Sequence, residues 1–147
     1  MATTTATISL SSSDLLTDNL SLSSTMNLYK GGTTATGLDQ FRMERFKIAT
    51  GTQFDLIEAT TAASEDANYV YIINKNTDPT HYVIVSIYDV VIGRLYAGDW
   101  MWMPWDSDVV AVGAGGSAIE IQAYVAEATI EYCLFHNGET KLTSDDS

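Results

Sequence analysis

The sequence predicts an all-β fold, an antiparallel sandwich or barrel preceded by an extended N-terminal arm. From about residue 38 onward, short segments rich in β-branched and aromatic residues recur at regular spacing, separated by turn-forming Gly, Asn, Asp and Pro. Before that point Ser and Thr dominate and apolar residues occur singly. Because such a stretch can hardly build a core of its own, residues 1–37 are predicted to form an arm.

The arm carries a weak strand signal. Residues 5–10 and 20–22 alternate between polar and apolar side chains with period two, which suits a strand that is added to another sheet or chain. The run Ser12-Ser13-Asp14 could instead cap one helical turn at Leu15. The apolar residues expected to contact a partner are Ile8, Leu10, Leu15, Leu20, Leu22 and Leu28.

The sandwich domain is predicted to span residues 38–137. Its first two strands are expected at residues 41–47 and 54–58, around a turn at Gly51, and residues 60–68 are expected to form a loop. The segments 69–73 and 82–87 are dense in β-branched and aromatic residues and flank the turn-rich stretch 74–80. This pattern predicts a hairpin with a long turn.

The second half of the domain continues the series. The strand at residues 100–105 should end at Pro104 or lie at a sheet edge, because proline cannot donate a ladder hydrogen bond. Further strands are expected at residues 109–112, 119–125 and 129–135, with a glycine turn at 113–116. Cys133, the single cysteine, is expected to be a buried, inert thiol. Residues 138–147 form a polar, acidic tail.

The charge of the chain excludes one class of partner. Nineteen acidic residues against seven basic ones give a formal charge of −12, which would repel a phosphate backbone, so no nucleic-acid partner is expected. Without a secretory-signal pattern or an apolar run of membrane-spanning length, we expect a soluble protein made in a cytoplasm, with no membrane partner. Four cations gather in one stretch and are either contacts for an acidic partner or a solvated strand face: Lys30, Arg42, Arg45 and Lys47.

The sequence holds little that indicates catalysis. It has no phosphate loop, dinucleotide fingerprint, nucleophile elbow or metal-spaced His/Cys set, and His81 and His136 are interpreted as strand-end residues. Asp99 with Asp106 or Asp108 could form a carboxylate pair, but no neighbouring base singles such a pair out. We therefore expect that the protein is not an enzyme and that it binds no cofactor and no metal.

The Trp/Met run at residues 100–105 is the most informative feature. In an extended strand Trp100 and Trp102 share one face and Met101 and Met103 the other, so both faces need a cover. The strand could lie between two layers, pack against an identical subunit or a partner, or offer Trp105 as a sugar platform beside Asp106 and Asp108. The predicted oligomer or partner interface consists of Trp100, Met101, Trp102, Met103, Trp105, Arg94 and Tyr96.

Three stretches carry a resemblance to a known family. Residues 71–85 contain Tyr-Ile-Ile-Asn, a short turn and Tyr-Val; residues 92–100 read Ile-Gly-Arg-Leu-Tyr-Ala-Gly-Asp-Trp; and Met-Pro-Trp follows at 103–105. Together they resemble virion structural proteins of tailed bacteriophages, especially those that infect cyanobacteria. The chain departs from that pattern at Lys75, inside the Asn-Thr turn, and at the run that begins with Trp100.

The resemblance implies a jelly-roll-like sandwich that is attached to a virion by an N-terminal segment. Its role would be that of a capsid decoration or cement protein bound to the major capsid protein or a neighbouring virion protein. We expect a homo-oligomer, with a trimer as the first guess. A neck, tail or fibre-base protein, or a host-surface carbohydrate-binding module, is the alternative.

Overall fold

A computed structural model describes residues 4–15, 17–29, 37–38, 40–57, 67–106 and 118–136. These residues form one two-stranded sheet and two four-stranded sheets. No helix among them is long and apolar enough to cross a bilayer.

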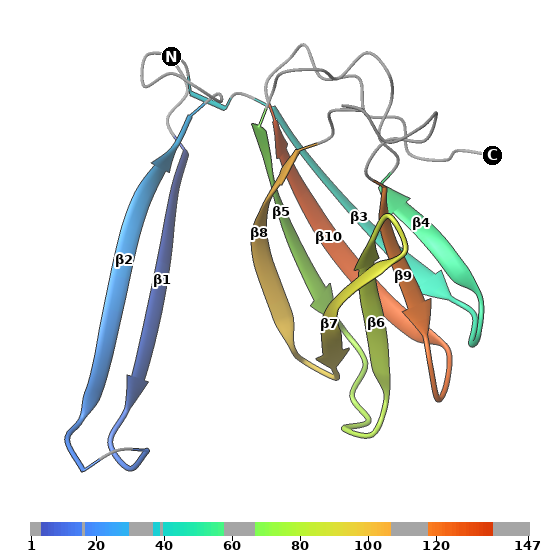
Figure 1. Ribbon diagram of the computed structural model, residues 1–147, viewed down its shortest axis with the longest axis horizontal. Coiled ribbons are helices and arrows are strands. Elements are labelled where there is room, and N and C mark those ends of the chain that lie inside the picture. The colour runs from blue at the N-terminus through green and yellow to red at the C-terminus, as the bar shows by residue number, and fades with distance from the viewer. Residues whose placement is uncertain are drawn as a thin grey trace.

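Two antiparallel sheets face one another and make the sandwich (Figure 1). The first sheet has the strand order β3 (Gln40–Ile48), β10 (Ala128–His136), β5 (Ala67–Asn74) and β8 (Trp100–Asp106). The second has the order β4 (Gln53–Ile57), β9 (Ile119–Ala123), β6 (Tyr82–Ile87) and β7 (Val90–Tyr96). All neighbouring strands in both sheets are antiparallel.

The strand order is that of a jelly roll. From β3 to β10, strands that follow one another in sequence lie in different sheets, with the single exception of the β6–β7 hairpin. Such repeated crossing between two four-stranded sheets is the jelly-roll arrangement. The prediction of an antiparallel, jelly-roll-like sandwich is confirmed, and so is the position of Pro104, because β8 is an edge strand.

The predicted hairpin between residues 69–73 and 82–87 is wrong. β5 pairs with β10 and β8 in the first sheet, whereas β6 pairs with β9 and β7 in the second. The side chain of Asn74, fully buried, fixes the crossing: its Nδ2 donates to the Leu95 carbonyl at 3.0 Å and its Oδ1 accepts from the Asn76 N–H at 3.0 Å. A turn-rich stretch between two strands cannot by itself tell a hairpin from a crossing between sheets.

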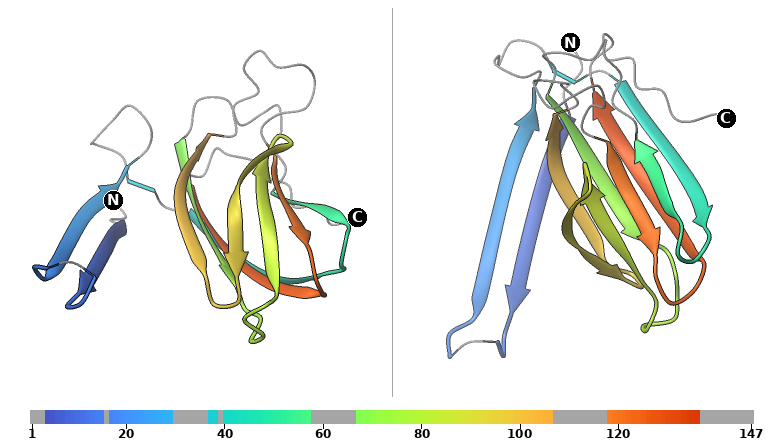
Figure 2. Two further views of the ribbon diagram at one scale, coloured as in Figure 1. Left: turned by 60° about the horizontal axis from the view of Figure 1, so that its bottom comes forward. Right: turned by 45° about the vertical axis from the view of Figure 1, so that its right-hand side comes forward.

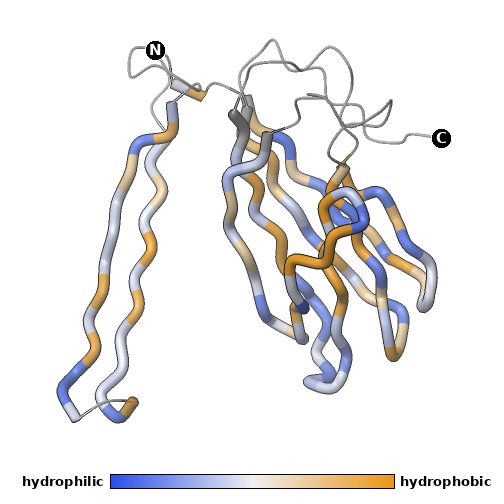
Figure 3. Tube along the Cα trace, in the orientation of Figure 1, coloured by the Kyte–Doolittle hydropathy of each residue, from blue (hydrophilic) through white to orange (hydrophobic). Residues whose placement is uncertain are grey.

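The core lies between the two sheets and consists of the alternate, inward-facing residues of every strand. Figure 3 shows apolar residues recurring along these strands. The fully buried members with large side chains are Leu56, Val70, Ile72, Val83, Val85, Ile119, Ile121, Ile130, Tyr132 and Leu134. Because the inward positions are filled this way, the alternate residues of the same strands are presented on the two outer surfaces.

The N-terminal segment forms a hairpin beside the sandwich. β1 (Thr4–Ser12) pairs with β2 (Leu20–Leu28) along its whole length, and Figure 2 shows the two strands standing apart from the sandwich. The two alternating stretches of the predicted arm therefore pair with one another. The Ser12 hydroxyl accepts the Leu15 N–H at 3.1 Å, as a helix cap would, but within the bend of the hairpin rather than in a helix.

Several predicted features lie outside the described residues. They are most of the expected loop at 60–68, the strand at 109–112, the glycine turn at 113–116 and the tail at 138–147.

Candidate functional site

The β1–β2 hairpin has one polar and one apolar face. On the polar face, Thr5 donates to Asn27 at 3.1 Å, and the hydroxyls of Thr7 and Thr25 lie 2.9 Å apart. The register places the apolar side chains together on the opposite face. This hairpin apolar face consists of Ala6, Ile8, Leu10, Leu20, Leu22, Met26 and Leu28.

Most of the hairpin apolar face is open to solvent. The exposed fractions are 38% for Ile8, 51% for Leu10, 49% for Leu22 and 45% for Met26. The base is covered: Leu28 is 1% exposed, and its carbonyl accepts the Leu38 N–H at 3.3 Å. Because an isolated two-stranded hairpin is marginally stable at best, this face needs a cover from elsewhere.

The outer surface of the first sheet carries a second uncovered apolar surface. The register aligns Phe41, Phe135 and Tyr69 in one row across the sheet. The next row aligns Met43, Cys133, Tyr71 and Trp102. We call this surface the outer aromatic face; it consists of Phe41, Met43, Tyr69, Tyr71, Trp100, Trp102 and Phe135.

The rings of the outer aromatic face touch one another. Trp102 stacks on Tyr69 with ring centroids 5.5 Å apart and meets Phe135 edge-on at 5.5 Å. Phe135 in turn lies 5.2 Å from Phe41. At the sheet edges the residues remain open, with 56% of Phe41, 57% of Met43 and 51% of Trp100 exposed. Aromatics and Met are the residue types enriched in the cores of protein interfaces.

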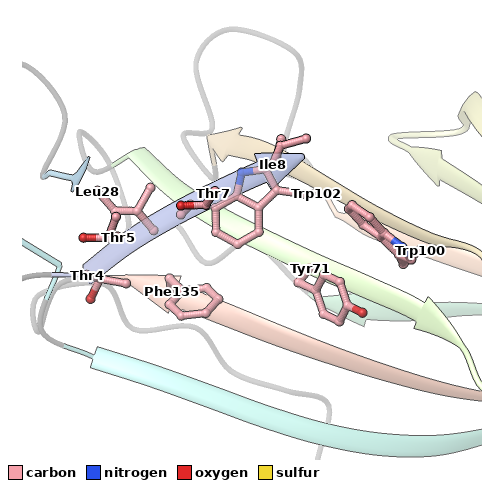
Figure 4. Close-up of a pocket in the computed structure, with 10 residues that line it drawn as sticks. Thr4, Thr5, Thr7, Ile8, Leu28, Tyr71, Trp100, Trp102 and Phe135 are labelled. Atoms are coloured by element: carbon pink, nitrogen blue, oxygen red, sulfur yellow. The ribbon is translucent and has the colours of Figure 1, made fainter. Parts of the chain in front are cut away.

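The two faces meet at a pocket of about 350 Å³ between the hairpin and the first sheet. The pocket is lined by residues 4–8 of β1 and by the rings of Phe135, Trp102, Tyr71 and Trp100 from the first sheet, and Figure 4 shows the labelled members of both groups. Leu10, Leu20 and Leu22, which lie toward the bend, do not line the pocket. The hairpin therefore approaches its own sheet at the base, while Leu10 and Leu22 in its distal half stay exposed.

The chain matches no known protein family, no curated protein and no solved structure.

The predicted interface residues at 100–105 separate by strand alternation. Trp100 and Trp102 belong to the outer aromatic face, as the interface prediction requires. Met101 and Met103 pack against the core instead, and Trp105 is a core residue with 3% exposure. Burial contradicts an interface role for Trp105 and the sugar platform built on it. Met101 and Met103 are only partly buried, so their role in an interface stays a prediction.

Arg94 and Tyr96, the other predicted interface residues, lie on the far side of the sandwich. There the ring centroids of Tyr96 and Tyr124 lie 5.3 Å and 5.5 Å from that of Tyr82, and the guanidinium of Arg94 lies 4.9 Å above Tyr82. Tyr96 and Tyr124 are 42% and 50% exposed. The predicted single interface is thus divided between two opposite outer surfaces.

The predicted arm contacts come together more closely. Ile8, Leu10, Leu20, Leu22 and Leu28 share the hairpin apolar face. Leu15 lies in the bend of the hairpin and is 70% exposed.

Three of the cations proposed for an acidic partner lie in the described part of the chain and are paired within it. Arg45 binds Glu131 at 2.6 Å, Lys47 lies 3.4 Å from Glu127, and Arg42 forms an ion pair with Glu44. Lys30 lies outside the described residues. For Arg45 and Lys47 the structure therefore favours the alternative of a solvated strand face with its own counter-ions.

Cys133 belongs to the outer surface of the first sheet and not to the core. It is half-buried in the row between Met43 and Tyr71. Burial and the nearby Glu131 carboxylate raise the pKa of its thiol. The expectation of a thiol buried in the core is wrong, because the side chain lies on the outer side of the strand. The raised pKa keeps the thiol protonated, which is its less reactive form.

Two further predictions concern titratable groups. Within the described part of the chain, no group of three or more His, Cys, Asp or Glu could hold a metal ion. His81 precedes β6 and lies 3.5 Å from Asp78, and His136 is the last residue of β10. Both histidines are at strand ends, as predicted. Asp108, a member of the possible hydrolase pair, lies outside the described residues.

The sequence interpretation missed most of the outer aromatic face. Phe41, Tyr69, Tyr71 and Phe135 were assigned to strands without any role in an interface. Their signal was the alternation itself, since each occupies the phase opposite to the buried residues of its strand. What the alternation could not supply was the order of the strands that brings the four side chains together.

Proposed function

We propose that the chain is a non-catalytic structural protein that binds and stabilises a larger protein assembly. Given its resemblance to virion structural proteins of tailed bacteriophages, the specific form of the proposal is a capsid decoration or cement protein that acts as a homo-oligomer in the virion. The observation that carries the proposal is the hairpin apolar face, which the chain displays and leaves largely uncovered.

The composition of the two surfaces supports an assembly role. Monomeric proteins rarely expose large contiguous apolar patches, and those that they expose commonly mark interaction sites. Here two such surfaces occur in one chain, one on a slender hairpin and one on a broad sheet. A jelly roll supplies a rigid body for this purpose, and viral capsid proteins, lectins and cupins all use it, so the fold alone does not decide the role.

Repetition would make such contacts effective. In a symmetric shell every contact recurs many times, and linked contacts can raise the overall affinity by about two to four orders of magnitude over a single contact. Among the described residues β1 and β2 pair with each other alone, so each strand offers a backbone edge through which it could add to a neighbouring sheet. The major capsid protein or a neighbouring virion protein is the proposed partner.

The proposal is tested on virus particles that lack this chain. Such particles should release their DNA at a lower temperature than complete particles, and purified wild-type chain should restore the release temperature. The variant Leu10→Thr/Leu22→Thr, which keeps β-forming residues in the hairpin, should fail to restore it. The polar-face variant Ser9→Ala/Ser23→Ala is the control and should act as wild type. Particles whose release temperature does not depend on the chain would refute the proposal.

A neck, tail or fibre-base protein remains the alternative within the virion. Such a protein would use the same two surfaces. The position of the chain in a map of the intact particle distinguishes a location on the capsid from one in the neck, tail or fibre base.

A second function is favoured by the tyrosine cluster on the opposite surface. Tyr96 and Tyr124 offer exposed rings beside Arg94, a combination that can stack on a sugar ring and bind its hydroxyls. A glycan array with wild-type chain and the Tyr124→Ala variant tests this. Glycan binding that the substitution abolishes would support the role of a host-surface carbohydrate-binding module. An array without any binding would refute this second function.

A further inference from the structure

We propose that the distal half of the hairpin of one copy packs on the outer aromatic face of a second copy, at the edge formed by Phe41 and Met43. This inference rests on the proposed assembly role and names the partner segment within it. The contact joins two different surfaces, so each copy both gives a hairpin and receives one.

The exposure pattern shows which parts of the two faces remain to be covered. Within its own chain the hairpin base lies across the pocket from the part of the outer aromatic face around Trp102. Leu10 and Leu22 lie beyond that pocket on the hairpin, and Phe41 and Met43 lie beyond it on the sheet. One chain thus displays two complementary uncovered halves that its own fold does not bring together.

Charge permits a second copy to bind at these two surfaces. The chain carries a formal charge of −12, so most contacts between two copies would oppose carboxylates. The hairpin is an exception, because Asp14 and Asp18, both near its bend, are the only charged residues in the first 29. The rows of the sheet that contain Phe41 and Met43 carry no charged side chain either. These two surfaces can meet without bringing like charges together.

The uncovered parts of the two elements are both short. On the hairpin, Leu10 and Leu22 are directly opposite one another in the register, and on the sheet Phe41 and Met43 are two residues apart on β3. Two residues of a strand span about 7 Å, so one apolar pair of the hairpin can contact both side chains of the sheet edge. A contact between two different surfaces closes into a ring if the rotation between copies allows it, and a trimer is one such ring.

The test is complementation between two variants in solution. Leu10→Thr/Leu22→Thr removes the hairpin contact and leaves the aromatic face intact. Phe41→Thr/Met43→Thr removes the receiving edge and leaves the hairpin intact. Wild-type chain should be oligomeric by light scattering, and each variant alone should be monomeric at the same concentration, with affinity reduced roughly 100-fold. An equimolar mixture of the two variants should form a one-to-one heterodimer, because one intact contact remains.

A control variant separates this contact from general stickiness. Val90→Thr/Val91→Thr removes two valines that are 67% and 61% exposed on the second sheet and should leave the oligomer unchanged. A monomeric wild-type chain, or variants that stay oligomeric, would overturn the inference. So would a mixture of monomeric variants that forms no heterodimer.

Disulfide trapping identifies which copy supplies the hairpin. Cys133 lies beside Met43 in the same row of the sheet, so a cysteine introduced in the distal half of the hairpin by Leu22→Cys can report on contact. Under oxidation, cross-linked dimers or larger species that the added Cys133→Ser substitution abolishes support exchange between copies. Monomers with an internal disulfide would show that the hairpin closes on its own sheet, which contradicts the inference. Hairpin cross-links found only with the capsid protein in particles would contradict it too, while leaving the assembly role intact.

Discussion

Replacing Asn74 by Ala should destabilise the sandwich substantially, because this side chain holds the crossing between the two sheets. Asn74 is 0% exposed, and its amide donates to the Leu95 carbonyl and accepts the Asn76 N–H, each at 3.0 Å. Its backbone groups are also engaged, with the N–H bound to the Asp99 carbonyl at 3.0 Å and the carbonyl to the Gly98 N–H at 2.8 Å. The Ala variant keeps the backbone bonds and loses both side-chain bonds.

The expected loss follows from the two groups left without a partner. A buried group that loses its hydrogen bond costs about 1–3 kcal/mol, and the Asn76 N–H, which is only partly buried, belongs at the lower end of that range. The free energy of unfolding should therefore fall by about 2–4 kcal/mol, a large part of the roughly 5–15 kcal/mol typical of a domain. Urea unfolding followed by tryptophan fluorescence measures this, because Trp105 lies in the core.

The matched control is Asn27→Ala on the hairpin, where the amide is exposed and bonded to Thr5. Its effect on the unfolding of the sandwich should stay below about 0.5 kcal/mol. A loss below about 1 kcal/mol for Asn74→Ala would refute the view that this residue fixes the crossing.

Two other predictions concern the two sides of the first sheet. Trp105→Ala should lower the free energy of unfolding by about 3–5 kcal/mol, because it leaves a cavity in the core. Trp102→Ala should lower it in the isolated chain by only about 1 kcal/mol, because it removes only ring contacts on the outer surface. Equal losses for the two variants in urea unfolding would contradict the assigned faces. Because burial and a nearby carboxylate raise the pKa of Cys133, its alkylation by iodoacetamide should be slower at pH 8 than in the urea-unfolded chain and should keep rising at higher pH. Identical pH profiles for folded and unfolded chain would show that the thiol is not shielded.

Local patterns in the sequence predicted the strands well, because the alternation of residue types along a strand indicates which of its residues are buried. In β10, Ile130, Tyr132 and Leu134 alternate with residues of the other face, and the structure buries all three. The same alternation places Cys133 on the outer side together with Glu131. The expectation of a buried thiol rested on the apolar character of the run and did not take this alternation into account.

Pairing between strands could not be predicted in the same way. It depends on where connections cross the sandwich, and here the decisive bond joins Asn74 to a carbonyl 21 residues away. The β6–β7 turn was equally hidden, because Tyr88 and Asp89 adopt positive φ values of 49° and 61° without the Asn-Gly signal usual for such turns. The outer aromatic face depends on strand order and so became apparent only in the fold.

Hydrogen exchange of the hairpin tests the central claim, that the hairpin apolar face is buried when the protein acts. Ile8, Leu10, Leu22 and Met26 are between 38% and 51% exposed. Burying the exposed parts of these four side chains should stabilise the hairpin by about 3–5 kcal/mol in total. Since about 1.4 kcal/mol corresponds to a factor of ten, amides of β1 and β2 should exchange roughly 100-fold to 1,000-fold more slowly in chain bound to particles than in dilute free chain. Equal exchange rates in the two states would contradict the account.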